Sequence, residues 1–199
     1  EMLRSLVGSE MCIRDSIGIG NTLHIDMLIE KLKKKNLGVI AIYGRLSRDR
    51  GEGVYDAMNK FFYKDGKLIV DSIISLSGYS LSTFYVGENR DFEISLFEKF
   101  NVPVFQAMTT YLTEEDFKED PQGIDIVSLS LNIYQPEMDG QIITLPIATK
   151  EKALKDGVLV DIFKPIEDRI DTLVDLVDRF SILKNKENKD KKIALILHN

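Results

Sequence analysis

The sequence predicts an α/β fold built on a doubly wound, largely parallel sheet. Short apolar runs rich in β-branched residues alternate with segments of helical period from about residue 21 to residue 133. Because parallel strands need long crossover connections, this alternation favours strands joined by helices that cover both faces of the sheet. An antiparallel strand, a long amphipathic helix and a truncated terminal strand are expected after residue 133.

The predicted helices share an apolar stripe at helical spacing, with charged residues on the remaining surface. In residues 23–35, "LHIDMLIEKLKKK", the lysines gather at the C-terminal end, where the helix dipole favours cations. Residues 113–123 begin with Thr113 and Asp116 at the spacing of a capping box. The clearest amphipathic pattern covers residues 165–183. The helices are expected at residues 23–35, 54–63, 91–100, 113–123 and 165–183.

The predicted strands are short apolar runs bounded by glycine, proline or polar residues. They are expected at residues 37–44, 68–78, 102–108, 124–134, 141–149 and 191–199. In the run at 124–134, Val127, Leu129, Leu131 and Ile133 would share one face of a strand. The run at 141–149 comes so soon afterwards that antiparallel pairing is expected, with "YQPEMDGQIITLP" supplying the turn.

Composition narrows the classes of function. Apolar residues make up 44% and charged residues 29% of the 199 residues, as in globular proteins. The net charge of -6 gives no electrostatic reason to expect nucleic acid as a partner. No apolar stretch is long enough to span a bilayer. The single cysteine, Cys12, excludes an internal disulfide and a cysteine-rich metal site, and the simplest compartment is the cytoplasm.

The two ends of the chain are expected to differ from the rest. Residues 1–16 show neither a helical nor a strand period and resemble translated linker or adaptor sequence, so we expect them to pack outside the core. The chain stops inside or just after the apolar run 191–199. We therefore expect a fragment truncated at both ends. Its parts would be a non-native segment at 1–16, an α/β segment at 17–133, and a segment at 134–199 with the turn, the helix and the start of the next segment.

Glu137 and Asp139 are the main candidates for chemistry. They lie between Pro136, which limits φ, and Gly140, which permits a sharp reversal. On composition alone they are solvent-exposed turn carboxylates, because Asp-Gly is a common turn pair. If one were buried beside the other, repulsion and desolvation would favour its protonated form, and it could then transfer protons near neutral pH.

Other polar residues favour structural interpretations. His24 and His198 have no second histidine or cysteine nearby at zinc-ligand spacing, so we interpret both as structural or surface residues. Aspartates recur at helical spacing in the segment 165–183, and we interpret them as the solvated face of that helix. They are Asp168, Asp171, Asp175 and Asp178.

Four segments together carry a family resemblance. They are "VPVFQAM", "GIDIVSLSLNIYQPEMDGQIITLPIA", "EDRIDTLVDLVDRF" and "KDKKIALILHN". In order and spacing they resemble the large subunit of ATP-dependent tetrapyrrole metal chelatases, the family of CobN-type cobaltochelatase and the H subunit of magnesium chelatase. That family carries a Pro-Glu-Leu-Asp-Gly motif, and Met138 replaces its leucine here, a volume-conserving change. The resemblance covers about residues 21–199 and is strongest from Val102 onward.

The resemblance implies insertion of a divalent metal into a tetrapyrrole ring. The large subunit would bind the ring and the metal, while AAA+ partner subunits would bind and hydrolyse ATP with magnesium. Two pyrrole N–H protons must leave as the metal enters, so a carboxylate base is useful. Carboxylate oxygens also suit an incoming hard or borderline cation. The resemblance thus implies Glu137 as catalytic base and metal ligand, Asp139 as its catalytic companion, and Arg169 and Gln106 as substrate-binding residues.

The metal is a choice within the family. The lysine-rich stretch "KNKENKDKKIALILHN" resembles the cobalt branch, which favours cobalt insertion into a corrin-type ring in cobalamin biosynthesis. The alternative is a magnesium chelatase H subunit that inserts magnesium into protoporphyrin IX. A non-catalytic, flavodoxin-like binding or assembly module, with a purely structural acidic turn, also stays open. The chain alone is expected to be inactive, because it lacks the partner ATPase and most of a macrocycle pocket.

Overall fold

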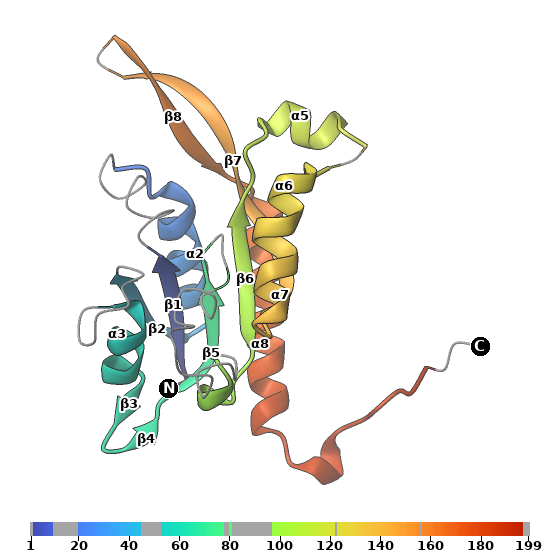
Figure 1. Ribbon diagram of the computed structural model, residues 1–199. Coiled ribbons are helices and arrows are strands. Elements are labelled where there is room, and N and C mark those ends of the chain that lie inside the picture. The colour runs from blue at the N-terminus through green and yellow to red at the C-terminus, as the bar shows by residue number, and fades with distance from the viewer. Residues whose placement is uncertain are drawn as a thin grey trace, which may run out of the picture.

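The computed structural model describes residues 2–9, 20–44, 53–77, 80, 97–121, 123–155 and 157–196, and its centre is a six-stranded sheet (Figure 1). The strands are β1 (Met2–Ser9), β2 (Leu37–Gly44), β5 (Val70–Ser75), β6 (Val104–Thr109), β7 (Ile142–Lys155) and β8 (Val158–Pro165). Their order is β2-β1-β5-β6-β7-β8, with β8 antiparallel to β7 and the other neighbours parallel. This is the flavodoxin-like order with an antiparallel edge strand added, so the predicted fold class is confirmed.

Helices cover both faces of the sheet. On one face, α2 (Leu23–Lys34) and α8 (Glu167–Asn185) pack their apolar stripes against side chains such as Phe105 and Ile147. On the other face, α3 (Val54–Phe61) and the 3-10 helix η2 (Glu98–Phe100) pack against Ile73 and Val104. Each fully buried side chain of this kind contributes roughly 1.5–3 kcal/mol to folding. A small hairpin, β3 (Tyr63–Lys64) with β4 (Lys67–Leu68), comes directly after α3.

Several predicted helices are confirmed. The helix α5 (Glu114–Glu119) begins as expected, because the Thr113 hydroxyl accepts a hydrogen bond of 3.1 Å from the Asp116 backbone N–H. The apolar stripe of α8 is buried, and its acidic face is exposed and partly paired with Lys31 of α2 and with Lys35 at the end of α2. Of the predicted helix at 91–100, residues 91–96 lie outside the described residues.

Residues 126–138 form a continuous helix, where the sequence predicted a strand over 124–134. It comprises α6 (Ile126–Leu129), the π-helical turn η3 (Ser130–Tyr134) and α7 (Gln135–Met138). Asp125 caps it, since its Oδ1 accepts hydrogen bonds of 3.0 Å from two backbone N–H groups. A short apolar run fits the period of a helix as well as that of a strand. Here the Asp125 cap and the need for a crossover connection between two parallel strands favour the helix.

The predicted turn is therefore the end of a helix. Asp139 is the C-cap residue of α7, and Gly140 comes next with φ 78°, the left-handed conformation that ends many helices. With a helix between them, β6 and β7 pair in parallel, with Phe105 opposite Ile142. The predicted antiparallel pairing of 141–149 is wrong. The antiparallel strand is β8, which was not predicted and which ends at Pro165.

Both ends also differ from expectation. Met2–Ser9 forms β1, a central strand between β2 and β5, so the expectation that residues 1–16 stay outside the core is wrong for this part. Residues 2–9 were assigned outside the core because they lack the continuous apolar run typical of a central parallel strand. Their backbone N–H and C=O groups nevertheless pair with both neighbouring strands, and this pairing is what a central strand requires. Residues 191–196 have no regular secondary structure, because no described strand pairs with them, so the terminal strand is not formed there. The division at 1–16, 17–133 and 134–199 stays a prediction.

Candidate functional site

The segment with the two candidate acids lies at the amino edge of the sheet. Gly140 comes two residues before β7 begins at Ile142, which pairs with Phe105 near the start of β6. Ligands of doubly wound sheets usually bind at the opposite edge, outside the carboxyl ends of the strands. A site at residues 136–140 would therefore use the helix end and its surroundings rather than the usual crevice of this fold.

Glu137 and Asp139 have opposite environments. Asp139 is only 4% exposed, and its Oδ1 accepts a hydrogen bond of 2.8 Å from the Ser80 hydroxyl. Glu137 is exposed to solvent in the last turn of α7. Side chains two residues apart on a helix do not face each other, so the two carboxylates are not the buried pair considered from the sequence. The end of the helix thus holds Asp139 in place and exposes Glu137 to solvent.

A cavity of about 450 Å³ opens beside Asp139. Its walls come from η2, from the connection between η2 and β6, and from Asp139 and Gly140. Phe97, Val102 and Val104 make much of the lining apolar, while Glu98 and Asn101 add polar groups. A hollow of this kind and size suits a small ligand or one part of a larger ligand.

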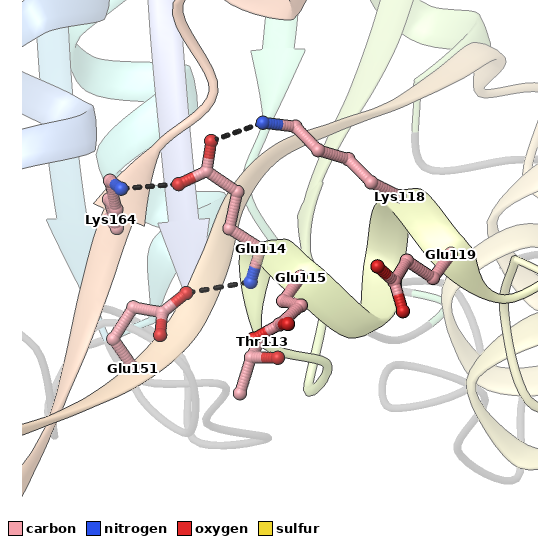
Figure 2. A pocket seen from close by; sticks show the side chains of 7 residues that line it. All are labelled: Thr113, Glu114, Glu115, Lys118, Glu119, Glu151 and Lys164. Atoms are coloured by element: carbon pink, nitrogen blue, oxygen red, sulfur yellow. Dashed lines mark hydrogen bonds and ion pairs between the residues drawn. The ribbon is translucent and has the colours of Figure 1, made fainter.

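A second polar cluster lies at the carboxyl edge of the sheet, around a cavity of about 570 Å³ between α5, β7 and β8 (Figure 2). Glu114 bonds Lys118 at 2.7 Å and also bonds Lys164, and these hydrogen bonds, with Lys118 first, lower the pKa of Glu114 to about 2. Glu151 accepts hydrogen bonds from the Glu114 backbone N–H at 2.7 Å and from the Thr149 hydroxyl at 3.1 Å. Glu114 thus pairs with Lys164 of β8, and Glu151 of β7 binds the first backbone N–H of α5, so the cluster fastens α5 to the β7–β8 ribbon.

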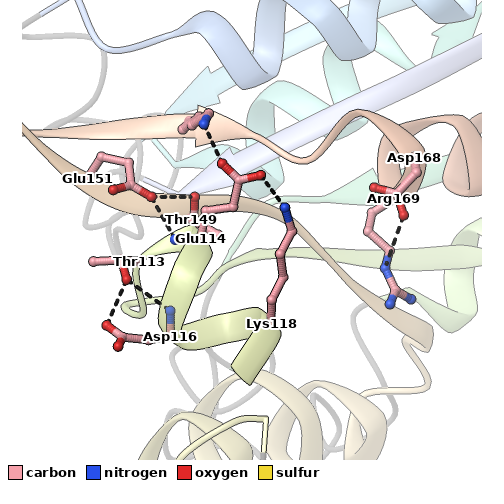
Figure 3. A network of polar contacts seen from close by, with 9 residues as sticks. Thr113, Glu114, Asp116, Lys118, Thr149, Glu151, Asp168 and Arg169 are labelled. Carbon is pink, nitrogen blue, oxygen red and sulfur yellow. Dashed lines mark hydrogen bonds and ion pairs between the residues drawn. The ribbon is translucent and has the colours of Figure 1, made fainter. Parts of the chain in front are cut away.

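The structure does not bring Arg169 and Gln106 to the two acids. Arg169 lies in the first turn of α8, where its Nε is 3.9 Å from Asp168 Oδ2 (Figure 3). That turn comes after Pro165, which pairs with Ala148 near the carboxyl edge of the sheet. The six residue steps from Ile142 to Ala148 along β7 span roughly 20 Å, at about 3.3 Å per residue.

Gln106 belongs to the sheet interior. It is fully buried in β6, and its Nε2 donates a hydrogen bond of 2.5 Å to the Ser77 carbonyl oxygen. Its Oε1 has no hydrogen-bond partner among the described residues. Because no part of the Gln106 side chain reaches solvent, its position suits support of the strand connections better than direct contact with a large substrate.

Two further buried polar residues were not predicted as site residues from the sequence. One is Ser80, whose hydroxyl holds Asp139. The other is Gln141, which is 1% exposed and whose Oε1 and Nε2 both lack a hydrogen-bond partner within the part of the chain that the structure describes. Such orphaned buried amides are rare and costly in proteins. A sequence signal for Gln141 existed in its place directly after the Asp-Gly pair. Ser80 lies in the run "SGYSLS" at a predicted strand end, which could line a pocket but which we interpreted as a turn.

The described residues contain no ready-made metal centre. No group of three or more His, Cys, Asp or Glu side chains that could hold a metal ion occurs in this part of the chain. His24 has the structural role expected for it, since its ring packs edge-on against Phe163 with centroids 5.5 Å apart. Burial lowers the pKa of His24 to about 4, and the nearby charge of Asp26 partly opposes this. His198 lies outside the described residues.

Comparison with solved structures identifies the fold, and comparison with family models identifies the family. The structure superposes on the catalytic subunit of cobaltochelatase from Mycobacterium tuberculosis with a TM-score of 0.69 over 96% of this chain and 15% of that chain, at 16% sequence identity. Both proteins therefore share one α/β fold. The family model described as CobN/Magnesium Chelatase matches residues 11–199. This chain belongs to the CobN/magnesium chelatase family, and the resemblance seen in the sequence is confirmed.

Two curated relatives show how similar this chain is to longer proteins and how much of their length it covers. An uncharacterized protein of Methanocaldococcus jannaschii is 36% identical over 184 residues, which cover 90% of this chain and 15% of that protein. The aerobic cobaltochelatase subunit CobN of Pseudomonas aeruginosa is 29% identical over 133 residues, which cover 64% of this chain and 10% of that subunit. This chain thus spans a small part of the length of its relatives. None of the helices among the described residues is both long and apolar enough to cross a membrane.

Proposed function

We propose that this chain is a segment of the tetrapyrrole- and metal-binding subunit of an ATP-dependent metal chelatase. Membership of the CobN/magnesium chelatase family supports this function for the whole protein. The proposal is assigned to particular residues from the arrangement at the end of α7. There the family motif presents Glu137 to solvent, while Asp139 is buried and hydrogen-bonded to Ser80.

In this proposal Glu137 is the catalytic base. A divalent cation replaces two pyrrole N–H protons, and the exposed carboxylate of Glu137 accepts these protons one after the other and passes each to water. The same oxygens can bind the incoming cation, which is a substrate, as it loses its water. Asp139 positions the helix end through Ser80. Reacting groups held in a fixed geometry lose less entropy at the transition state.

The other two candidate residues take different places in the proposal. Gln106 supports the buried strand connection through Ser77 rather than touching the ring. Arg169 lies at the opposite edge of the sheet from Glu137, so we do not assign both residues to one bound ring. A substrate carboxylate at Arg169 would require a different binding position.

We favour cobalt and a corrin-type ring, as in cobalamin biosynthesis. The similarity to a cobaltochelatase subunit and the lysine-rich sequence around residues 184–192 support this choice. Magnesium and protoporphyrin IX are the alternative, because the family includes magnesium chelatases. AAA+ partner subunits would hydrolyse ATP with magnesium to drive the insertion. Parallel insertion assays with Co²⁺ and Mg²⁺ on the full-length subunit and its partners distinguish the two metals.

The test of the catalytic proposal is Glu137→Gln in the full-length subunit, assembled with its partners. This change removes the charge and the base but keeps the shape. We expect the insertion rate to fall about a hundredfold or more, while tetrapyrrole affinity stays within about twofold of the wild type. Glu115→Gln, another exposed carboxylate on a helix, is the matched control and should insert metal normally. Near-normal insertion by Glu137→Gln would favour the non-catalytic module instead.

A further inference from the structure

The helix over residues 126–138 buries two polar side chains and leaves several of its large apolar side chains exposed. Ser128, Asn132 and Pro136 are buried and recur at every fourth position. Large apolar side chains of the same helix are exposed, namely Ile126, Val127, Tyr134 and Met138. An ordinary amphipathic helix shows the reverse arrangement. Exposed apolar side chains that gather on one element mark a surface for another molecule or segment.

The last turn of this helix combines apolar surface with the candidate base. Tyr134 is 56% exposed and Met138 is 86% exposed. They are four residues apart, so their Cβ atoms lie about 5–6 Å from each other on one side of the helix. Glu137 precedes Met138 directly, and at about 3.6 residues per turn these three side chains fall within an arc of roughly 100°.

We propose that Tyr134 and Met138 form a platform for the flat apolar face of the tetrapyrrole ring, with Glu137 reaching the ring nitrogens. This inference rests on the proposed function and extends it to the residues that hold the ring. An aromatic ring and a polarizable thioether both pack well against a π system. The Glu137 carboxylate complements the central N–H groups and the entering cation.

The position of the charge favours a ring at the last turn, because Glu137 is the only acidic or basic residue between Ile126 and Met138. A protein or domain interface would use the whole exposed stripe, including Ile126 and Val127 at the start of the helix. Val127 lies ten residues before Glu137, about 15 Å along the helix axis. A ring centred on Glu137 contacts only the last turn, so the two ends of the helix should respond differently to substitution.

The platform is attached to a rigid base. Pro136 is buried beneath it, Asp139 is tied to Ser80, and Gly140 ends the helix with φ 78°. These contacts fix the direction in which the last turn faces. The exposed side chains can therefore be changed without removing the contacts that hold the helix end.

The test uses the full-length subunit and two probes, protoporphyrin IX and a metal-free corrin-type ring, titrated by fluorescence or absorbance. Tyr134→Ser and Met138→Ser should each raise the dissociation constant of the preferred ring roughly tenfold. Met138→Leu keeps the apolar volume and should bind several-fold tighter than Met138→Ser. Val127→Ser, also exposed and apolar in the wild type, is the matched control and should leave ring affinity unchanged.

The outcomes separate this proposal from the proposed function. Unchanged ring affinity in both the Tyr134→Ser and Met138→Ser variants would overturn the platform, even where Glu137→Gln abolishes insertion. An equal loss of affinity in Val127→Ser would also overturn it, because the whole stripe would then be a protein interface. Normal insertion by Glu137→Gln, combined with weak ring binding by the two serine variants, would leave the platform standing and remove Glu137 as the base. Thermal unfolding curves should show that all these variants remain folded.

Discussion

Ser80 donates a hydrogen bond of 2.8 Å to Asp139, and the two buried side chains come from positions 59 residues apart in the chain. The bond ties the connection after β5 to the helix end before β7. It holds the segment that carries Glu137 against the body of the domain. The geometry of the candidate site therefore depends on a contact that crosses the fold.

Ser80→Ala should destabilise the protein. A hydrogen bond to a charged group contributes about 1.5–3 kcal/mol, and the alanine variant cannot donate one. Denaturant unfolding should show a loss of this size. Ser130→Ala is the matched control, since Ser130 is exposed on the neighbouring helix, and its change should stay within about 0.5 kcal/mol. Equal stabilities of the two variants would mean that the Ser80 bond contributes nothing to folding.

His24 should make stability fall at mildly acidic pH. Burial lowers the pKa of His24 in the folded protein to about 4 from an ordinary value of 6.5. Between these values the unfolded chain binds a proton that the folded chain does not, so stability is lost as pH falls from 6.5 toward 4. The contribution lost between pH 7 and pH 5 is about 2 kcal/mol.

The measurement compares unfolding free energies of the wild type and His24→Leu at pH 7 and pH 5. The leucine variant keeps an apolar side chain beside Phe163 but has no proton to bind. The wild type should lose about 2 kcal/mol more than the variant over this range. Identical pH dependence in the two proteins would show that His24 is protonated equally in the folded and unfolded states.

Lys31 should stabilise the packing of α2 against α8. Its Nζ lies 2.6 Å from Asp171 and 2.9 Å from Glu167, and the hydrogen bond to Asp171 is the main cause that raises the pKa of Lys31. Both carboxylates are largely exposed, which limits the gain. Lys31→Met should cost about 1 kcal/mol at low salt and less at about 1 M salt.

The control for Lys31 is Lys34→Met. Lys34 pairs with Glu30 at 2.6 Å within α2, and both side chains are well exposed. Its loss should lower the free energy of unfolding less than Lys31→Met does. A cost for Lys31→Met that does not change with salt would point to lost packing of the lysine stem rather than to its charge.

The apolar run near residue 195 should promote self-association of the 199-residue chain. Ile193, Leu195 and Ile196 are exposed and belong to no described strand. Unpaired backbone beside β-branched and apolar side chains favours pairing with another chain. Light scattering should show association that rises with protein concentration, and Leu195→Glu should reduce it strongly. Ile126→Glu, which changes another exposed apolar residue, serves as the control, and an equal effect there would argue against the terminal run.

Signals that act within a few residues were read correctly from the sequence. The Thr113 cap and the buried stripe of α8 depend on neighbours three or four positions away, so their pattern is visible in one dimension. The alternation of strands and helices likewise predicted the doubly wound fold. The helix at 126–138 was missed because its apolar residues also fit a strand.

The sequence by itself determined the α/β class, the family resemblance and the choice of Glu137 and Asp139 as candidates, because these depend on residue types in order along the chain. The tertiary structure decided that β7 pairs in parallel, that Asp139 is buried on Ser80 while Glu137 faces solvent, and that Arg169 lies at the opposite edge. Burial and partnership depend on which distant segments meet. These long-range contacts are set by how the crossover helices pack on the sheet, and the spacing of nearby residues does not encode them.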